Sequence, residues 1–189
     1  EYLNTADIAN VCKAGYFSAN CFPDAMRDTY LYFAAQSGFD PDTVQAEALH
    51  SVGWQVYDAE AVRIEGAEEL LAALKNRARL FLLTQGDPLV QEKRLEKSGL
   101  LPYFEAYAIV RQKNADAFRA LIAEWDIEVS RSWMIGNSLR SDINPALQAG
   151  LRAAHFQIPG WDYEYAAPTG GHITLHKLID FLELITDED

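Results

Sequence analysis

Hydrophobic and polar positions change their spacing once along the chain, near residue 65. Before that point apolar residues recur every three or four positions, as from Ala25 to Ser37, and no stretch alternates as a strand does. Asp40 and Pro41 are typical of a helix start, so we expect a second helix with Asp40 as its N-cap, running toward Trp54. Residues 1–65 are therefore predicted to form a helical module.

After residue 65, short apolar runs alternate with helical segments. Four such runs are present, over residues 79–84, 107–110, 132–136 and 152–158. Helices are expected between them and, at the end, over about residues 175–185. This cadence is typical of strand–helix–strand units, whose right-handed crossovers build a parallel sheet covered on both faces. The nearly unbroken apolar runs also favour a parallel sheet, because strands of such a sheet are buried on both faces. We predict an α/β fold with a doubly wound parallel sheet.

Composition and charge narrow the class of partner. The 189 residues are 49% hydrophobic and 23% charged, which excludes an intrinsically disordered chain. No apolar run approaches the ~20 residues that a membrane-spanning helix needs. The net charge of −12 repels phosphate backbones and anionic membranes, so we expect no nucleic acid and no membrane partner. Cys12 and Cys21 are too few for a disulfide framework and point to a cytoplasmic protein with reduced thiols. The sequence does not give the oligomeric state, and a homodimer is left open.

Polar residues follow three of the predicted strands, where ligands bind in an open parallel sheet. Thr84 ends the first run, and Gln85 and Gly86 lead into a helix. A hydroxyl beside the free N–H groups of a helix start can hold a phosphate. The alternative is purely structural, with Asp87 capping this helix and Pro88 in its first position.

The second and third strand ends carry a cation and oxygen ligands. Lys113 follows the second run and can neutralise an anionic intermediate. The alternative is that it is an ordinary cationic residue on a solvent-exposed loop. Asn137 and Asp142 follow the third run and offer oxygen atoms of the kind that Mg²⁺ takes. The alternative is that Ser141 or Asp142 caps the next helix, which has Pro145 in its first turn. Both interpretations can hold together, because this helix starts at the ligand edge of the sheet.

A serine hydrolase is a weaker interpretation of the same segment. Residues 136–140 nearly match the GxSxG nucleophile elbow, but Arg140 stands where the second glycine relieves a crowded turn. Ser138, Asp162 and His172 follow in the chain order of a hydrolase triad. The missing glycine and the small size of the chain favour the phosphate site.

The three strand ends, in this order, resemble the motifs of the haloacid dehalogenase-like superfamily. Most of its members are Mg²⁺-dependent phosphatases with an aspartate nucleophile. The strand ending at Thr84 looks like the second motif, and Lys113 before Asn114 looks like the third. Residues 134–146 look like the acidic fourth motif and are the most specific match. Further segments resemble an uncharacterised phosphatase-like branch of the superfamily, namely residues 15–17 and 159–164.

The resemblance covers roughly residues 8–185 and implies a Rossmann-like core, a helical cap and a role for each site residue. It implies Mg²⁺ as the cofactor and a small phosphorylated molecule as the substrate. The implied residues are Thr84 and Lys113 for catalysis, Thr84, Gln85, Gly86 and Lys113 for phosphate binding, and Asn137 and Asp142 for the metal.

Two departures from the family pattern shape the expectation. The first motif, an Asp-x-Asp that carries the nucleophile, has no counterpart, because residues 39–43 copy its letters only inside the helical module. The chain begins at Glu1 without a methionine, so we expect a preceding segment with this motif and the central strand. Residues 1–65 would then be a partial cap, and residues 66–189 a core that lacks its first strand. Asn137 is the second departure, since the family usually has aspartate there.

The expected function is hydrolysis of a small phosphate ester through an aspartyl-phosphate, with the nucleophile upstream of this chain. One alternative is an inactive relative that binds a ligand or partner, suggested by the missing nucleophile and by Asn137. Another is a 2-haloacid dehalogenase, which uses the same aspartate without a metal. The aromatic residues between Tyr16 and Phe33 suit its apolar substrate, although such residues are more often core.

Overall fold

The computed structural model describes residues 1–60, 62–158 and 165–186. The chain divides into two compact units, of which one combines Glu1–Ala61 with Gln85–Ser98 and the other combines Val62–Thr84 with Gly99–Asp189. We call them the helical unit and the sheet unit. The segment Gln85–Ser98 of the helical unit falls inside the range predicted for the core. The roles of the two units as cap and core stay predictions.

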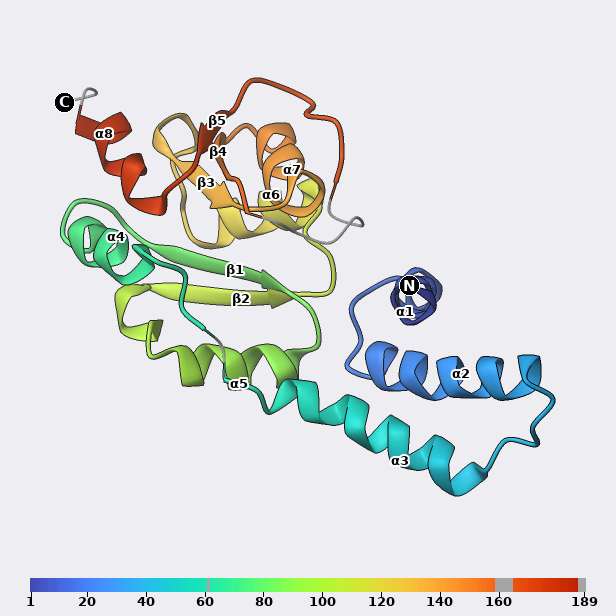
Figure 1. Cartoon of the computed structure of the whole chain (residues 1–189). Helices are drawn as coiled ribbons and strands as arrows, with labels where there is room; N and C mark the ends of the chain where they lie inside the picture. The colour runs from blue at the N-terminus through green and yellow to red at the C-terminus, as the bar shows by residue number, and fades with distance from the viewer. Residues whose placement is uncertain (61, 159–164, 187–189) are drawn as a thin grey trace. The chain divides into compact units, whose positions relative to one another are not determined.

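The helical unit is built almost entirely of helices, as the sequence predicts. Its elements are α1 (Tyr2–Ala14), α2 (Cys21–Gln36), α3 (Thr43–Trp54), the 3₁₀ turn η1 (Gln55–Tyr57) and α5 (Pro88–Ser98). Helix α3 turns back alongside α2 (Figure 1). Gly53 permits this close packing, because a Cβ there would lie 2.7 Å from Pro23 Cα.

The predicted start of α3 is wrong by two residues. Asp42, not Asp40, is the N-cap, and its Oδ1 accepts a hydrogen bond from Val44 N at 2.8 Å. The backbone of Asp42 is also fixed by α2, since its N–H donates to the Tyr30 hydroxyl at 3.0 Å. The cap expected for α5 is confirmed, because Asp87 Oδ1 accepts from Leu89 N at 3.1 Å.

The sheet unit contains the strands and the remaining helices. The strands are β1 (Phe81–Gln85), β2 (Ala106–Val110), β3 (Trp133–Gly136), β4 (Arg152–Phe156) and β5 (Ile173–Leu175). The helices are α4 (Ala67–Leu74), α6 (Ala115–Glu124), α7 (Asn144–Gln148) and α8 (Phe181–Thr186). The α/β class is confirmed. The helix expected over 175–185 is wrong in its first half, where β5 and the 3₁₀ turn η6 (Leu178–Asp180) stand instead.

The strands of the described residues form two sheets rather than one. The first sheet pairs β1 with β2, whose arrows point the same way in Figure 1. The second has the order β3-β4-β5, and both of its pairings are parallel, with Gly136 opposite His155 and Phe156 opposite Leu175. Helices α5, α6 and α7 lie between successive strands from β1 to β4 in the sequence, so the parallel arrangement there agrees with the expected strand–helix–strand units.

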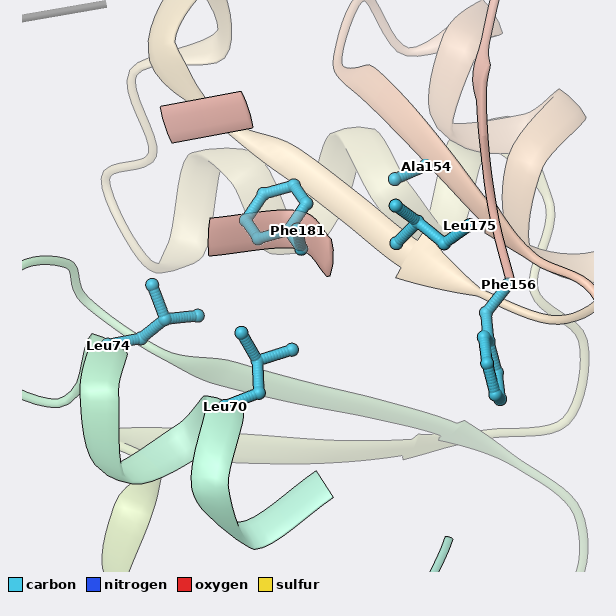
Figure 2. Packing of buried hydrophobic residues seen from close by; sticks show 6 residues of the cluster. All are labelled: Leu70, Leu74, Ala154, Phe156, Leu175 and Phe181. Carbon is cyan, nitrogen blue, oxygen red and sulfur yellow. The ribbon is translucent and has the colours of Figure 1, made fainter. Parts of the chain in front are cut away.

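Side chains that alternate along β3 enter two separate cores. Trp133 and Ile135 pack against the first cluster, which joins α4 and α8 to β4 and β5, whereas Met134 packs against the second. Figure 2 shows the first cluster, with its side chains from all four elements. Its buried members are Leu70, Leu74, Ala154, Phe156, Leu175 and Phe181. The second cluster contains Phe118, Ala146 and Leu151. Helices therefore cover both faces of the β3-β4-β5 sheet.

Strand β1 contributes to the same two cores as β3, although the two strands do not pair. Leu83 of β1 packs against the second cluster, as Met134 does. Leu80, the residue before β1, packs against the first cluster, as Trp133 and Ile135 do. Within the described residues, β1 pairs only with β2 and β3 only with β4. One edge of each strand thus has no strand partner there. No helix in the part of the chain that the structure describes is long and apolar enough to span a bilayer.

Candidate functional site

The structure brings together Lys113 and Asp142, two of the residues that the sequence singled out. Lys113 follows β2 and Asp142 follows β3, and Lys113 Nζ lies 2.6 Å from Asp142 Oδ1. The side chains are 14% and 5% exposed, respectively. A charge-assisted pair this short and this far from water is strong only while both members are present, since either alone would be a buried charge. This pair is the centre of the candidate site.

A turn at the end of β3 folds the Asp142 carboxylate back against the strand. Residues Leu139–Ile143 form one π-helical turn, and the Ser138 carbonyl accepts hydrogen bonds from the N–H groups of Asp142 and Ile143, both at 3.0 Å. Ser138 N donates to Asp142 Oδ2 at 3.0 Å. Gly136 makes room, because a Cβ there would lie 2.4 Å from Asp142 Oδ2. Glycine at the strand end is thus required by the carboxylate that faces it.

Ser138 is a capping residue rather than a nucleophile. It is buried, and its Oγ accepts a hydrogen bond from Ser141 N at 2.9 Å. The cap expected from Ser141 or Asp142 is wrong, because the N-cap of α7 is Ile143 without a side-chain bond, and Ser138 caps the π-helical turn before it. Asp162, the acid of the considered hydrolase triad, lies outside the described residues. The ring of His172 packs against His155 instead, with centroids 5.8 Å apart.

Asn137 lies at the same strand end and is exposed. Its backbone carbonyl oxygen lies 3.0 Å from Nε2 of His155 on the neighbouring strand β4. This contact fixes the backbone at Asn137 and leaves the amide side chain toward solvent. A role for Asn137 in metal binding stays a prediction.

The first strand end carries the predicted phosphate-binding residues. Thr84 and Gln85 are the last residues of β1, and both are partly buried. Gly86 follows with φ 146°, a backbone conformation that favours glycine, and its missing Cβ accommodates the Gln91 side chain. The sequence thus leaves β1 through a tight turn into α5, as expected. The phosphate-binding role of these three residues stays a prediction.

The donor set suits a hard cation such as Mg²⁺ but does not fill its coordination sphere. Each Asp142 oxygen accepts one hydrogen bond and retains a further lone pair for a metal, and Asn137 offers an amide oxygen. Mg²⁺ commonly takes one or two protein carboxylates and completes its octahedron with water and phosphate. The described residues contain no group of three or more His, Cys, Asp or Glu side chains placed to hold a metal. The residues present therefore fit a partial Mg²⁺ site.

A second group of titratable residues lies in the helical unit. Asp7 in α1 is only 4% exposed, and burial raises its pKa. Burial also raises the pKa of the Cys21 thiol, and the pKa of Tyr57 rises to about 12, with Asp7 adding a smaller effect in both cases. All three neutral forms are thus favoured by the same surroundings. No pattern in the sequence points to a functional role for these residues.

The three strand ends lie within a segment that matches a known protein family. A family model described as "haloacid dehalogenase-like hydrolase" matches residues 12–150, which include all three strand ends. The chain belongs to the haloacid dehalogenase-like hydrolases. The resemblance expected from the motifs at Thr84, Lys113 and Asp142 is confirmed at the level of the family.

Similar proteins of known name are phosphatases and nucleotidases. A pyrimidine 5'-nucleotidase of Escherichia coli is 31% identical over 130 residues, which are 63% of this chain and 56% of that protein. The human N-acylneuraminate-9-phosphatase is 28% identical over 94 residues, which are 47% of this chain and 38% of that protein. The chain thus spans about half the length of these relatives, or less.

Solved structures of the family share the fold. A haloacid dehalogenase-like hydrolase from Xanthomonas campestris has a TM-score of 0.78 at 22% identity, covering 100% of this chain and 76% of that one. The L-2-haloacid dehalogenase of Xanthobacter autotrophicus has a TM-score of 0.63 at 14% identity, covering 100% and 85%. At these identities the likeness concerns the fold alone.

Proposed function

We propose that the complete protein is a Mg²⁺-dependent phosphatase that cleaves a small phosphate ester through an aspartyl-phosphate. The observation that carries the proposal is the buried Lys113–Asp142 pair at the ends of β2 and β3. A cation and a carboxylate held this close, at the edge where parallel sheets bind ligands, suit an anionic substrate and a metal.

In this proposal the residues of this chain bind and orient the substrate, and an aspartate upstream of this chain is the nucleophile. Lys113 donates to the phosphoryl oxygens and to the attacking carboxylate, which offsets their repulsion. Thr84 donates its hydroxyl proton to a phosphoryl oxygen, and Gln85 and Gly86 offer N–H groups beside it. Asp142 and Asn137 would hold the Mg²⁺, which would supply positive charge against the nucleophile and phosphate.

Among the described strands β1 pairs with β2 and β3 with β4, and this order leaves room in the proposal for an additional strand between β1 and β3 as the source of the nucleophile. Both strands already fill the same two cores, so a strand inserted there would have an apolar layer on each face. It would also pair with the backbone of both strands. An aspartate at its end attacks phosphorus, the P–O ester bond breaks, and a second carboxyl protonates the leaving oxygen. Water then cleaves the aspartyl-phosphate.

The relatives suggest the size of the substrate. The names of the compared proteins include a pyrimidine 5'-nucleotidase and an N-acylneuraminate-9-phosphatase, so we expect a nucleoside monophosphate or sugar phosphate rather than a phosphoprotein. The role of the helical unit as a cap that limits substrate size belongs to the same proposal.

The test is phosphate release by the complete protein from a panel of such monophosphates, with and without MgCl₂. Asp142→Asn should lower kcat/KM by about 10²-fold or more, because it removes the carboxylate charge. Asp116→Asn is the matched control, since Asp116 forms an equally short pair with Arg119 at 2.7 Å on the exposed surface. Full activity of the Asp142→Asn variant, or activity in EDTA, contradicts the phosphatase proposal.

A 2-haloacid dehalogenase is the second candidate function. The observation in its favour is that Lys113 already neutralises Asp142, so the pair needs no metal for charge balance. Chloride release from 2-haloacids that persists in EDTA would support it. Phosphate-ester binding without turnover of either substrate class would instead identify an inactive relative.

A further inference from the structure

Asn144 is a buried polar residue for which the sequence gave no role. It is 7% exposed and is the first residue of α7, two positions after Asp142. Helices that follow parallel strands begin at the ligand edge of the sheet. Asn144 therefore lies beside the candidate site, at the end of the turn that carries its carboxylate.

The Asn144 side chain binds a loop far away in the sequence. Its Nδ2 donates to the Ala167 carbonyl at 2.8 Å, and its Oδ1 accepts from Thr169 N at 2.9 Å and from Thr169 Oγ1 at 3.2 Å. We call residues 165–170, which lead toward β5, the return loop. The primary amide of Asn144 donates to a carbonyl and accepts from an N–H at once, which matches the polar groups that this loop presents.

The return loop also passes close to α7 one turn further along. A Cβ placed at Gly170 would lie 3.5 Å from Leu147 Cδ1, so α7 bounds the space beside Gly170. The hydrogen bonds of Asn144 and the proximity of Leu147 therefore both place the loop along this helix.

The turn between Asp142 and Asn144 is closely packed and hydrogen-bonded. Ile143 between them has no exposed surface, and neither has Ala146 on the next turn. The Ser138 carbonyl holds both Asp142 N and Ile143 N. Because close-packed interiors transmit strain, this turn offers a physical route between Asp142 and Asn144.

We propose that Asn144 is a positioning residue that ties the return loop to the turn carrying Asp142, so that a ligand at the Lys113–Asp142 site also orders this loop. The inference rests on the proposed function for the identity of the ligand. We call the three hydrogen bonds from Asn144 to Ala167 and Thr169 the clamp. The clamp is independent of the proposed function.

Hydrogen–deuterium exchange of the complete protein tests the clamp first, without ligand. Asn144→Leu keeps the size of the side chain and removes all three hydrogen bonds, so amide exchange in the return loop should be about tenfold faster or more. Asn144→Asp keeps the acceptor for Thr169 and should fall in between. Ser132→Ala is the matched control, because it also removes one side-chain hydrogen bond, to the Glu128 carbonyl at 2.7 Å, but at the opposite end of β3. Unchanged loop exchange in Asn144→Leu overturns the proposal.

The second stage adds MgCl₂ and inorganic phosphate as the probe. In the unmodified protein, we expect slower exchange both in residues 136–146 and in the return loop, and in Asn144→Asp only in residues 136–146. A response at 136–146 without one in the return loop overturns the coupling and leaves the phosphatase proposal intact. No response in either segment counts against the phosphatase proposal and the coupling together, while the ligand-free comparison still decides the clamp.

Discussion

At the scale of single residues, the site depends on close approaches that tolerate no extra atoms. Gly136 and Asp142 are the clearest case, because the carboxylate occupies the space where any other residue would carry its Cβ. The strand end and the charged residue therefore constrain each other. A mutation at either position is expected to act on both stability and ligand binding.

Gly136→Ala tests this constraint. The added Cβ would lie 2.4 Å from Asp142 Oδ2, so the carboxylate must shift, and we expect a loss of about 1–3 kcal/mol in the free energy of unfolding. Gly171→Ala is the control, since a Cβ there meets nothing within 4 Å. Chemical denaturation measures both variants, and equal midpoints would contradict the steric account.

The buried Asp7 gives a pH-dependent prediction. Its raised pKa means that the folded protein binds this proton more tightly than the unfolded chain does. The associated stability is present at acidic pH and is lost as the pH rises through the folded-state pKa. Asp7→Asn stays neutral, so it should raise the Tm at pH 7, with the gain shrinking toward pH 4. Thermal melts across this range measure the gain, and Asp40→Asn, an exposed position, should show none.

At the scale of elements, the sequence predicted what short-range patterns encode. Apolar runs located four strands because each run is long enough to stand out. The predicted start of α3 was two residues too early because Asp40 and Asp42 are both plausible caps. Only the hydrogen bond from Val44 N to the Asp42 carboxylate decides between them. Strand β5 was missed, since three residues carry no periodic signal.

The α3 cap can be tested with a matched pair. Asp42→Ala removes the hydrogen bond to Val44 N and should cost about 0.5–2 kcal/mol of stability. Asp40→Ala, the cap that the sequence favoured, should change stability little, because Asp40 is exposed and lies before the helix. The reverse order of the two effects in denaturation experiments would refute the assignment of Asp42.

The candidate site was predictable only where its residues follow strands. Lys113 and Asp142 are 29 positions apart, yet the rule for parallel strand ends brought them together in advance. Asn144 escaped notice because its partners are 23 and 25 positions away in a loop without pattern. Ser138 was noticed for the wrong reason, since its hydroxyl serves the backbone of Ser141.

At the scale of the whole molecule, the two units should respond separately to core mutations. Leu70→Ala removes buried contacts between α4 and the rest of the sheet unit and should cost about 2–5 kcal/mol. Hydrogen exchange should then accelerate in α4, α8 and the β3-β4-β5 sheet, and not in α1 to α3. Leu89→Ala, at a 79% exposed position, is the control. Equal acceleration in both units would show that they unfold as one.

The chain passes between the two units three times, near residues 61, 84 and 98. The helical unit is consequently discontinuous in the sequence, and exchange of one contiguous gene segment within residues 1–61 or 85–98 would not transfer it whole. Any recombination that transplanted residues 1–61 alone would leave α5 behind, with Lys93 and Lys97 deprived of their contacts to Asp58. Lineages descended from this arrangement should therefore inherit both segments together, and a shuffled gene that separates them should be rare among those that yield folded protein.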